Sequence, residues 1–471
     1  MRNLKTSLFA FVFLLTTGFA FAQRSYKISY QQLKEYEGVY QYGKEDKLTI
    51  AASPVDTCLV AIIKLSVYPL KSADKDVFTD VGKNKITFLR NSSSQIIGYA
   101  KGNDTNRLIA RSVKFSPKMW YPKMGADVKT YQYKYTTPGK FKDGLQPGDA
   151  TAVGLDTALL DKMMNKIVRG QYPNVHSVLI IKGGKLVFEE YFYEYTKDSL
   201  QEMRSATKSI VSALTGIAIH QGFIKSKNER VVSYFPEYNL ANNTDIKKTI
   251  TVENMLANQS GLDCDVSNPK SAGAEEAMDA SDDWVKFTLD LPMIDRPGND
   301  GRYCSGNPIT IGRIVEKTTH MDLPVFGQKN LFGPLGITGY KWNFKPDRSN
   351  INEYCQIYLH PRDMAKFGLL YLNKGVWNKK QVIPAEWVTE SFRKHSVVQG
   401  VDYGYLWWLK YLDADGGVRY YGKAAQGNGG QKIYIFPDQD LVVAITGGNY
   451  NSKSPSDELI SKYILPSFNK K

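Results

Sequence analysis

Two predicted β-hairpins lie far apart in this 471-residue chain, and together they constrain its fold more than any other feature. One joins Val178–Ile181 to Leu186–Phe192, and the other joins Lys432–Phe436 to Leu441–Thr446. The sequence between the hairpins is helical and rich in loops. Because apolar strands must be buried against other elements, we expect both ends of this region to form one antiparallel sheet with helices packed on it, an α+β fold.

The N-terminal end of the chain has the composition of a targeting segment. Residues 1–22 carry Arg2 and Lys5 ahead of an apolar run and end in Ala20-Phe21-Ala22, which is the pattern of a cleaved secretory signal. We therefore expect an exported protein that is periplasmic or extracellular.

Three further segments follow this predicted signal. Residues 23–135 consist of short runs rich in Tyr, Val, Ile and Thr, broken by Gly, Asp, Asn and Ser, which predicts a small all-β domain. Residues 136–152 contain two Pro-Gly pairs and few apolar side chains, which is typical of a linker. Residues 153–471 make up the α+β domain.

Composition argues against several functional classes. The net charge is +14, but basic residues are scattered and interleaved with acidic ones, which indicates a solvated surface rather than a nucleic-acid interface. The histidines and cysteines have no metal-ligand spacing, and glycine-rich phosphate loops are absent. After the signal, no apolar run is long enough to span a bilayer. We expect no metal, no cofactor, no nucleic-acid partner and no transmembrane span.

A serine and a lysine three residues apart, Ser205 and Lys208, open a long apolar helix that the sequence predicts up to Gly222. Residues i and i+3 share a helix face, so the Lys208 amine can reach the Ser205 hydroxyl. The positive end of the helix also favours the anion that forms when a serine attacks a carbonyl. The pair predicts an activated nucleophile. The alternative is that Ser205 caps the helix and Lys208 is a solvated surface charge.

Two glycine-rich segments supply candidates for the remaining roles. Tyr303 lies in Pro297–Asn307, just before a helix predicted to start at Ile309, and is a candidate to transfer a proton to the leaving group. Core packing is the alternative for this tyrosine. The segment Gln426–Gln431 enters a strand, and its glycines allow a substrate carbonyl to approach backbone N–H groups. An ordinary turn is the alternative there.

The order of these elements resembles the penicillin-recognising serine hydrolase superfamily, in the branch of class C β-lactamases, family-VIII-type esterases and 6-aminohexanoate-dimer hydrolases. The resemblance covers roughly Val178 to Thr446 and implies a β-lactamase/transpeptidase-like fold with a helical, loop-rich subdomain. The matching stretches are Met203–Leu214, Thr249–Leu256, Ser260-Gly261-Leu262, Pro297-Gly298, Phe332–Ile337, His360–Gly368 and Tyr403–Trp408.

The resemblance also implies a role for each candidate residue. Ser205 would form the acyl-enzyme, Lys208 would act as its base, and Tyr303 would protonate the leaving group and later activate water. The backbone N–H groups of Ser205 and Asn428 would form the oxyanion hole. Around these groups, the candidate substrate-binding residues are Ser305, Asn307, Gly429 and Gln431.

Two motifs depart from the pattern of the resembled families. The usual Tyr-x-Asn is Tyr303-Cys304-Ser305 here, and Asn307 follows two positions later. The third motif is Ala425-Gln426-Gly427, which lacks the cation that binds a penicillin carboxylate unless Lys423 or Lys432 replaces it. We therefore expect weak activity on β-lactams.

Further residues bear on the substrate and the site walls. Between Gly261 and Arg302 there is no tyrosine of the kind that oligoamide hydrolases use, so we expect an ester or small-amide substrate. The resemblance implies a disulfide between Cys264 and Cys304. Of Trp407 and Trp408, at most one lines an acyl pocket, because adjacent strand residues face opposite sides; core packing is the alternative for these tryptophans. Two alternatives stay open: a D-alanyl peptidase, and a catalytically impaired binding or sensor protein.

Overall fold

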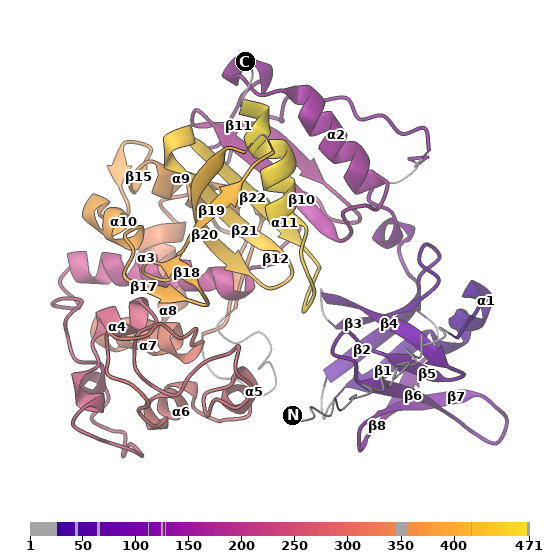
Figure 1. Ribbon diagram of the computed structural model, residues 1–471, viewed down its shortest axis with the longest axis horizontal. Helices are drawn as coiled ribbons and strands as arrows, with labels where there is room; N and C mark the ends of the chain where they lie inside the picture. Colours follow the sequence, from indigo (N-terminus) through magenta and orange to yellow (C-terminus); the bar gives the residue numbers. More distant parts are fainter. Residues whose placement is uncertain are drawn as a thin grey trace, which may run out of the picture.

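The computed structural model describes residues 26–42, 46–63, 66–111, 113–123, 126–127, 129–344, 356–415 and 417–468. The predicted signal segment, residues 1–22, lies outside them. The described chain forms an N-terminal β-barrel and a larger mixed α/β part beside it (Figure 1). Within these residues, no helix has both the length and the apolar character needed to cross a membrane.

The N-terminal barrel is closed, because β1 pairs with both β2 and β8. Side chains alternate along its strands as the pleat requires. In β6, for example, Ile86 and Phe88 are buried while Lys85 is exposed. The expected all-β domain is confirmed. Its strands are β1 (Gly38–Tyr42), β2 (Asp46–Ala52), β3 (Leu59–Ile63), β4 (Ser66–Asp74), β5 (Val77–Thr79), β6 (Lys85–Arg90), β7 (Ile96–Lys101) and β8 (Asp104–Ala110).

Aromatic rings fill part of the barrel interior. Tyr36, Tyr40, Phe78 and Phe88 pack with ring centroids 4.8–5.8 Å apart, a spacing typical of favourable aromatic pairs. Leu33 of the short helix α1 (Tyr30–Leu33) is buried in the same cluster.

The second part is built on a sheet whose described strands follow the order β17-β18-β19-β20-β21-β22-β10-β11-β9. β10 pairs antiparallel with β22, so the two predicted hairpins lie side by side and close one sheet, as expected. The strands are β9 (Gln146–Pro147), β10 (Val175–Lys182), β11 (Lys185–Tyr191), β17 (Ser396–Val398), β18 (Val401–Tyr403), β19 (Trp408–Asp413), β20 (Arg419–Gly427), β21 (Gln431–Phe436) and β22 (Leu441–Gly447).

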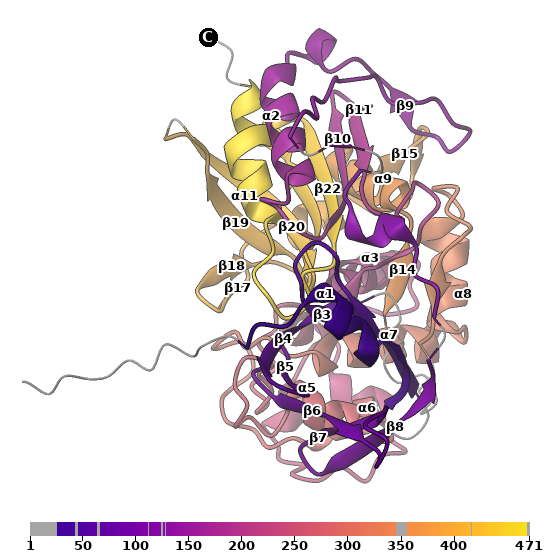
Figure 2. The same ribbon diagram turned by 90° about the vertical axis from the view of Figure 1, so that its right-hand side faces the viewer.

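Helices cover both faces of this sheet. α9 packs on β10, β21 and β22, and α2 with the C-terminal α11 lies on the opposite face (Figure 2). A helical region from α4 to α8 lies beyond α3, and α3 packs on α7 of that region. The helices are α2 (Thr157–Val168), α3 (Thr207–His220), α4 (Val252–Leu256), α5 (Glu275–Asp279), α6 (Trp284–Asp290), α7 (Gly306–Thr319), α8 (Leu323–Gly327), α9 (Pro361–Leu372), α10 (Ala385–Ser391) and α11 (Ser456–Leu459).

The stretch predicted as a linker, residues 136–152, packs against the second part. Its two-residue strand β9 pairs in parallel with β11. Asp143 accepts hydrogen bonds from the buried Arg362 at 2.5 and 3.2 Å, and the Arg362 guanidinium also contacts the carboxylate of Glu189 at 2.6 Å. A buried arginine between two carboxylates is costly to separate from either of them, so this stretch is held firmly in place.

Two small sheets complete the second part. The first has the order β12-β14-β13 and lies next to the candidate nucleophile, and the second is a hairpin. Their strands are β12 (Gln201–Glu202), β13 (Lys341–Trp342) and β14 (Ile357–Leu359), and β15 (Val376–Trp377) and β16 (Lys380–Gln381).

Candidate active site

Ser205 lies in a single 3-10 turn, Arg204–Ala206, that leads directly into α3. Lys208 Nζ donates a hydrogen bond to the Ser205 hydroxyl, with a distance of 2.8 Å from Nζ to Oγ. Lys208 is only 9% exposed, and Ala206 occupies the N-cap position of α3. The alternative of a capping serine and a solvated lysine is therefore wrong.

Backbone contacts hold this turn in an unusual conformation. Arg204 has a φ of +47°, in the left-handed region that costs energy for a residue with a side chain. Met203 N–H donates to Ile357 O at 2.8 Å, which attaches the turn to β14. On the other side, a Cβ atom at Gly427 would lie 2.2 Å from Met203 O, so only glycine lets the end of β20 approach the turn this closely.

The structure confirms the helix predicted after Ser205 and its predicted end near Gly222. α3 stops at His220, and Gly222 has a φ of +78°, as expected of a glycine just past a helix end. In its first turns, the Ser209 hydroxyl donates to Leu406 O at 2.7 Å, which ties α3 to the sheet.

Tyr303 lies beside the lysine. The Lys208 Nζ atom is 5.2 Å from the centre of the Tyr303 ring. The ring also packs against Trp408 and Tyr403, with centroids 5.2 and 6.4 Å away. Tyr303 therefore packs in the core, with its ring beside the candidate base, and it is not part of the lining of the cavity described below.

The loop that carries Tyr303 is held by a disulfide and by one asparagine. Cys264 and Cys304 are joined, which confirms the expected pairing. The side-chain oxygen of Asn258 accepts hydrogen bonds from Asn307 Nδ2 at 3.0 Å and from Cys304 N–H at 3.4 Å. The backbone oxygen of Asn258 accepts from Arg302 N–H at 2.8 Å. Sequence reasoning missed Asn258, and its place two residues before Ser260-Gly261-Leu262 is the only signal that marks it.

A cavity of about 160 Å³ opens beside Ser205. Of the predicted site residues it is lined by Ser205, Lys208, Ser305 and Asn428. The side chain of Asn428 is fixed by Asn451, with hydrogen bonds of 2.7 and 2.9 Å.

Three predicted substrate-binding residues do not line this cavity. Asn307 is fully buried and its amide is used by Asn258. Gln431 is also fully buried, and its Nε2 donates to Gly447 O at 2.6 Å, which links β21 to β22. Gly429 forms an isolated bridge with Asn449 at a φ of +93°. These residues make contacts within the protein, outside the lining of the cavity.

Carboxylates from α5, which sequence reasoning missed, line the cavity. Glu275 accepts a hydrogen bond from the Ser305 hydroxyl at 3.0 Å, and Asp279 lies one turn further along α5. The pKa of Asp279 is raised to about 7, because its carboxyl is buried and because the carboxylates of Glu275 and Glu276 lie nearby. The pattern Glu-Glu-x-x-Asp was the available signal, but nothing local in it indicates which way the helix faces.

The two lysines considered as replacements for the missing cation point elsewhere. The Lys423 ammonium lies 3.3 Å from the centre of the Tyr421 ring, and burial lowers its pKa to about 8. Lys432 donates to Gln426 at 2.8 Å and pairs with Asp457 at 3.2 Å. Neither residue is part of the cavity lining, whose cations are Arg204 and Lys208.

Neither tryptophan lines the cavity either. Trp407 is completely buried and stacks on Phe367 with ring centroids 6.0 Å apart. Trp408 forms the wall behind Tyr303. The core-packing alternative therefore holds for both residues.

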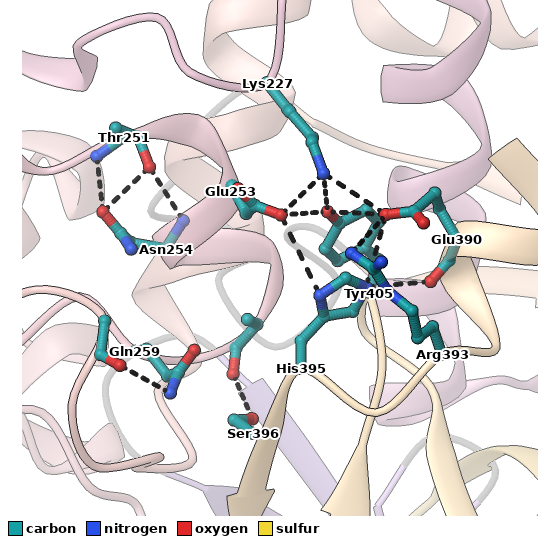
Figure 3. A network of polar contacts seen from close by, with 12 residues as sticks. Lys227, Thr251, Glu253, Asn254, Gln259, Glu390, Arg393, His395, Ser396 and Tyr405 are labelled. Carbon is teal, nitrogen blue, oxygen red and sulfur yellow. Dashed lines mark hydrogen bonds and ion pairs between the residues drawn. The ribbon is translucent and has the colours of Figure 1, made fainter.

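One group of side chains in the described part of the chain has the spacing of metal ligands: Glu253, Glu390 and His395. The Lys227 ammonium lies between its carboxylates, 2.8 Å from Glu253 and 3.2 Å from Glu390 (Figure 3). Lys227 also donates to the Tyr405 hydroxyl at 2.8 Å. The position that a cation would take is thus filled by a side chain, and the network joins α4 and α10 to the loop before β19.

Comparison with known proteins agrees with this geometry. The family model described as Beta-lactamase matches residues 160–459, more than half of the chain. The chain therefore belongs to the beta-lactamase family of serine hydrolases, which confirms the resemblance found in the sequence.

Individual relatives are distant. A protein from Escherichia coli (strain K12), provisionally named a D-alanyl-D-alanine carboxypeptidase, is 24% identical over 218 residues, covering 40% of this chain and 49% of that protein. The chain thus spans about half the length of this curated relative.

Solved structures show the fold. A family VIII carboxylesterase has a TM-score of 0.53 and 17% identity, covering 66% of this chain and 97% of its own. Simvastatin synthase from Aspergillus terreus has a TM-score of 0.54 and 16% identity, covering 67% and 99%. The β-lactamase/transpeptidase-like fold is confirmed.

Proposed function

We propose that this chain is an exported serine hydrolase that cleaves an ester or small amide through an acyl-enzyme on Ser205. The observation that carries the proposal is the 2.8 Å contact between Lys208 Nζ and Ser205 Oγ at the wall of a cavity. A nucleophile within hydrogen-bond reach of a buried base is the arrangement that nucleophilic catalysis requires.

In the proposed reaction, the neutral Lys208 amine takes the proton of the Ser205 hydroxyl as Oγ bonds to the substrate carbonyl carbon. The negative oxygen that results accepts hydrogen bonds from the backbone N–H groups of Ser205 and Asn428. Tyr303 passes the proton taken up by Lys208 to the departing alcohol or amine, and the bond between this group and the carbonyl carbon breaks. Water, activated by the same groups, then attacks the acyl carbon and releases the acid and free Ser205.

The charge of the cavity supports a substrate without a carboxylate near the scissile bond. Glu275 and Asp279 repel an anion, and Arg204 already pairs with Glu202 at 3.0 Å. β-Lactams and D-alanyl peptides both carry such a carboxylate. Neutral or cationic esters and amides fit this cavity better.

Export is proposed from the sequence of residues 1–22 alone. Expression of the full chain in a bacterial host, followed by fractionation and intact mass, tests it. The proposal expects a periplasmic or secreted protein that begins at Gln23, whereas a cytoplasmic protein with an intact N-terminus contradicts it.

The reaction is tested with p-nitrophenyl esters from acetate to octanoate. We expect turnover, and an acyl mass adduct on Ser205 after a brief substrate pulse. Ser205→Ala removes both. Ser212→Ala is the matched control, because Ser212 lies on the same helix and its hydroxyl has no hydrogen-bond partner among the described residues. Stable labelling by a fluorescent penicillin without ester turnover would favour the D-alanyl peptidase alternative, and absence of both would favour the binding protein.

A further inference from the structure

The N-terminal barrel encloses a cavity of about 500 Å³ next to its aromatic cluster. Volumes of about 300–1,000 Å³ are typical of small-molecule sites. The inner wall is mainly apolar, with Leu48, Ile50, Ala61, Leu70, Ile86 and Tyr99. The barrel thus holds a preformed apolar space that its own side chains leave unfilled.

This cavity is bounded on one side by the hydrolase part. Glu202, Arg204, Glu276, Tyr358 and Asn451 complete its lining. The two parts also touch where Tyr68 of β4 meets Tyr450, with ring centroids 6.1 Å apart.

The cavity of about 160 Å³ beside Ser205 is called the catalytic cavity below. Arg204 and the helix α5 lie between it and the barrel cavity, and each of them borders both cavities. Arg204, the residue before Ser205, lines the two cavities. In α5, Glu275 lines the catalytic cavity and the next residue, Glu276, lines the barrel cavity. Both views place α5 on the side of the hydrolase that faces the barrel (Figures 1 and 2). The barrel cavity therefore adjoins the place where the proposed bond cleavage occurs.

We propose that the barrel cavity receives an unbranched apolar chain of the substrate whose ester or amide bond is cut at Ser205; this inference rests on the proposed function. The catalytic cavity holds only about 160 Å³, so a long chain does not fit there, although Met278, Trp284 and Ile309 form part of its wall. In the barrel wall, Asp80 and Lys101 pair with each other at 2.9 Å, and the remaining charged lining residues, Glu202, Arg204 and Glu276, belong to the hydrolase side of the cavity. An eight-stranded barrel is wide enough for one small ligand, which favours a slender chain.

The test compares chain-length dependence in the whole protein and in a variant with a filled barrel. Ala61→Trp places an indole in the cavity, and Ile97→Trp, on a β7 residue that is 47% exposed, is the matched control. The quantity measured is the ratio of kcat/KM for p-nitrophenyl dodecanoate to that for the acetate within each protein. Burial of a methylene contributes roughly a fourfold preference. We expect the ratio to fall at least about tenfold in Ala61→Trp and to stay at the parent value in Ile97→Trp.

Two arms identify which part of the substrate enters the barrel. One varies the acyl chain, and the other varies the alcohol chain of acetate esters. A fall in either arm supports the inference and names the part, while equal ratios in parent and variant overturn it. If Ala61→Trp does not fold, Ile63→Trp replaces it, because Ile63 lines the same cavity and is only half-buried.

A covalent probe separates failure of this inference from failure of the proposed function. A dodecyl fluorophosphonate with a terminal diazirine loses fluoride as its phosphorus bonds to Ser205, and ultraviolet light then links the chain end to its neighbours. Cross-links to peptides of β2, β3 or β4 support the inference. A labelled Ser205 with cross-links only to hydrolase residues that do not line the barrel cavity overturns the inference alone, and an unlabelled Ser205 overturns the proposed function on which it rests.

Discussion

The catalytic cavity and the barrel cavity differ in almost every physical respect. The first is about 160 Å³ and presents Lys208, Glu275 and Asp279, whereas the second is about 500 Å³ and its barrel wall consists largely of aliphatic and tyrosine side chains. Charged groups act strongly only where they are few, fixed and partly shielded from water, which requires a small space. Binding an apolar chain requires volume and dry walls. The two proposals together assign bond cleavage and substrate recognition to separate regions that meet at Arg204.

The largest expected effect is the loss of kcat on replacing one of two buried lysines, Lys208 and Lys423, and it tests this division of roles. Lys208→Met removes the proposed base, and we expect kcat for p-nitrophenyl acetate to fall by about 10²–10⁴, as is typical of lost general-base catalysis. Lys423→Met is the matched control, because Lys423 is equally buried but lies outside both cavities. A comparable loss in the two variants would mean that the catalytic cavity is not where the reaction occurs.

The next effect distinguishes the stabilities of the two regions. The disulfide between Cys264 and Cys304 spans 40 residues, and the loop-closure model gives about 4 kcal/mol for a bridge of that span. We expect Cys264→Ser with Cys304→Ser to lower the unfolding free energy of the hydrolase region by roughly this amount and to reduce kcat, since Tyr303 adjoins Cys304. Denaturant unfolding followed by tryptophan fluorescence measures the change.

Cys58→Ser is the control in the barrel, where Cys58 is a free thiol. It should leave the hydrolase transition unchanged. If both changes shift one shared transition equally, the two regions unfold as a unit and their stabilities cannot be separated.

Acid should also affect the two regions differently, because every histidine lies after residue 175. His176 is buried and its Nδ1 contacts Gln201 Oε1 at 2.9 Å. Burial lowers the pKa of His176 to about 4, although the Gln201 contact opposes the shift. Between pH 6.5 and 4 the unfolded chain therefore binds a proton that the folded chain does not, so stability falls as the pH falls.

From this pKa difference we expect His176 to lower the stability of the hydrolase region by roughly 3 kcal/mol between pH 6.5 and pH 4, while the raised pKa of Asp279 acts in the opposite direction. His176→Gln should remove most of that dependence, while His220→Gln, at a side chain that is 65% exposed, should retain it. Unfolding free energies at several pH values measure this. A pH profile of His176→Gln that matches the parent would show that other groups cause the acid sensitivity.

The sequence predicted those parts of the molecule that depend on local patterns. Apolar runs on either side of a short turn indicated both hairpins, with two glycines in the first turn, and helical spacing placed Lys208 beside Ser205. The all-β N-terminal domain was also visible from its short runs of β-forming residues. A small barrel was one of the two arrangements that these runs allowed, but its unfilled cavity was not predictable, because strand patterns do not record how much of an interior the inward side chains occupy.

The errors at the site arose where contacts between distant residues decide orientation. Asn307 and Gln431 were expected to face the substrate, but Asn258 and Gly447 take their amides inside the protein. Asn258 lies 49 residues from Asn307, and that distance hides the pairing from any local pattern. Glu275 and Asp279 were missed because the direction that α5 faces depends on its packing against the rest of the fold.

The smallest expected effect tests whether the charge of the catalytic cavity selects substrates. Asp279 has a pKa of about 7, so its carboxylate is charged above that pH and neutral below it. An ester with an ammonium group should therefore be preferred over its uncharged analogue by about threefold more at pH 8 than at pH 6, the size of a solvent-screened ion pair. Asp279→Asn should give the same preference at both pH values, as measured by kcat/KM for the two esters. Glu276→Gln provides the comparison, because Glu276 faces the barrel cavity; its loss should lower the Asp279 pKa but leave the preference pH-dependent, since burial is the larger cause of the shift. If Glu276→Gln abolished that dependence and Asp279→Asn did not, the charge that selects the substrate would belong to the barrel side, and the division of roles between the two cavities would have to be reversed.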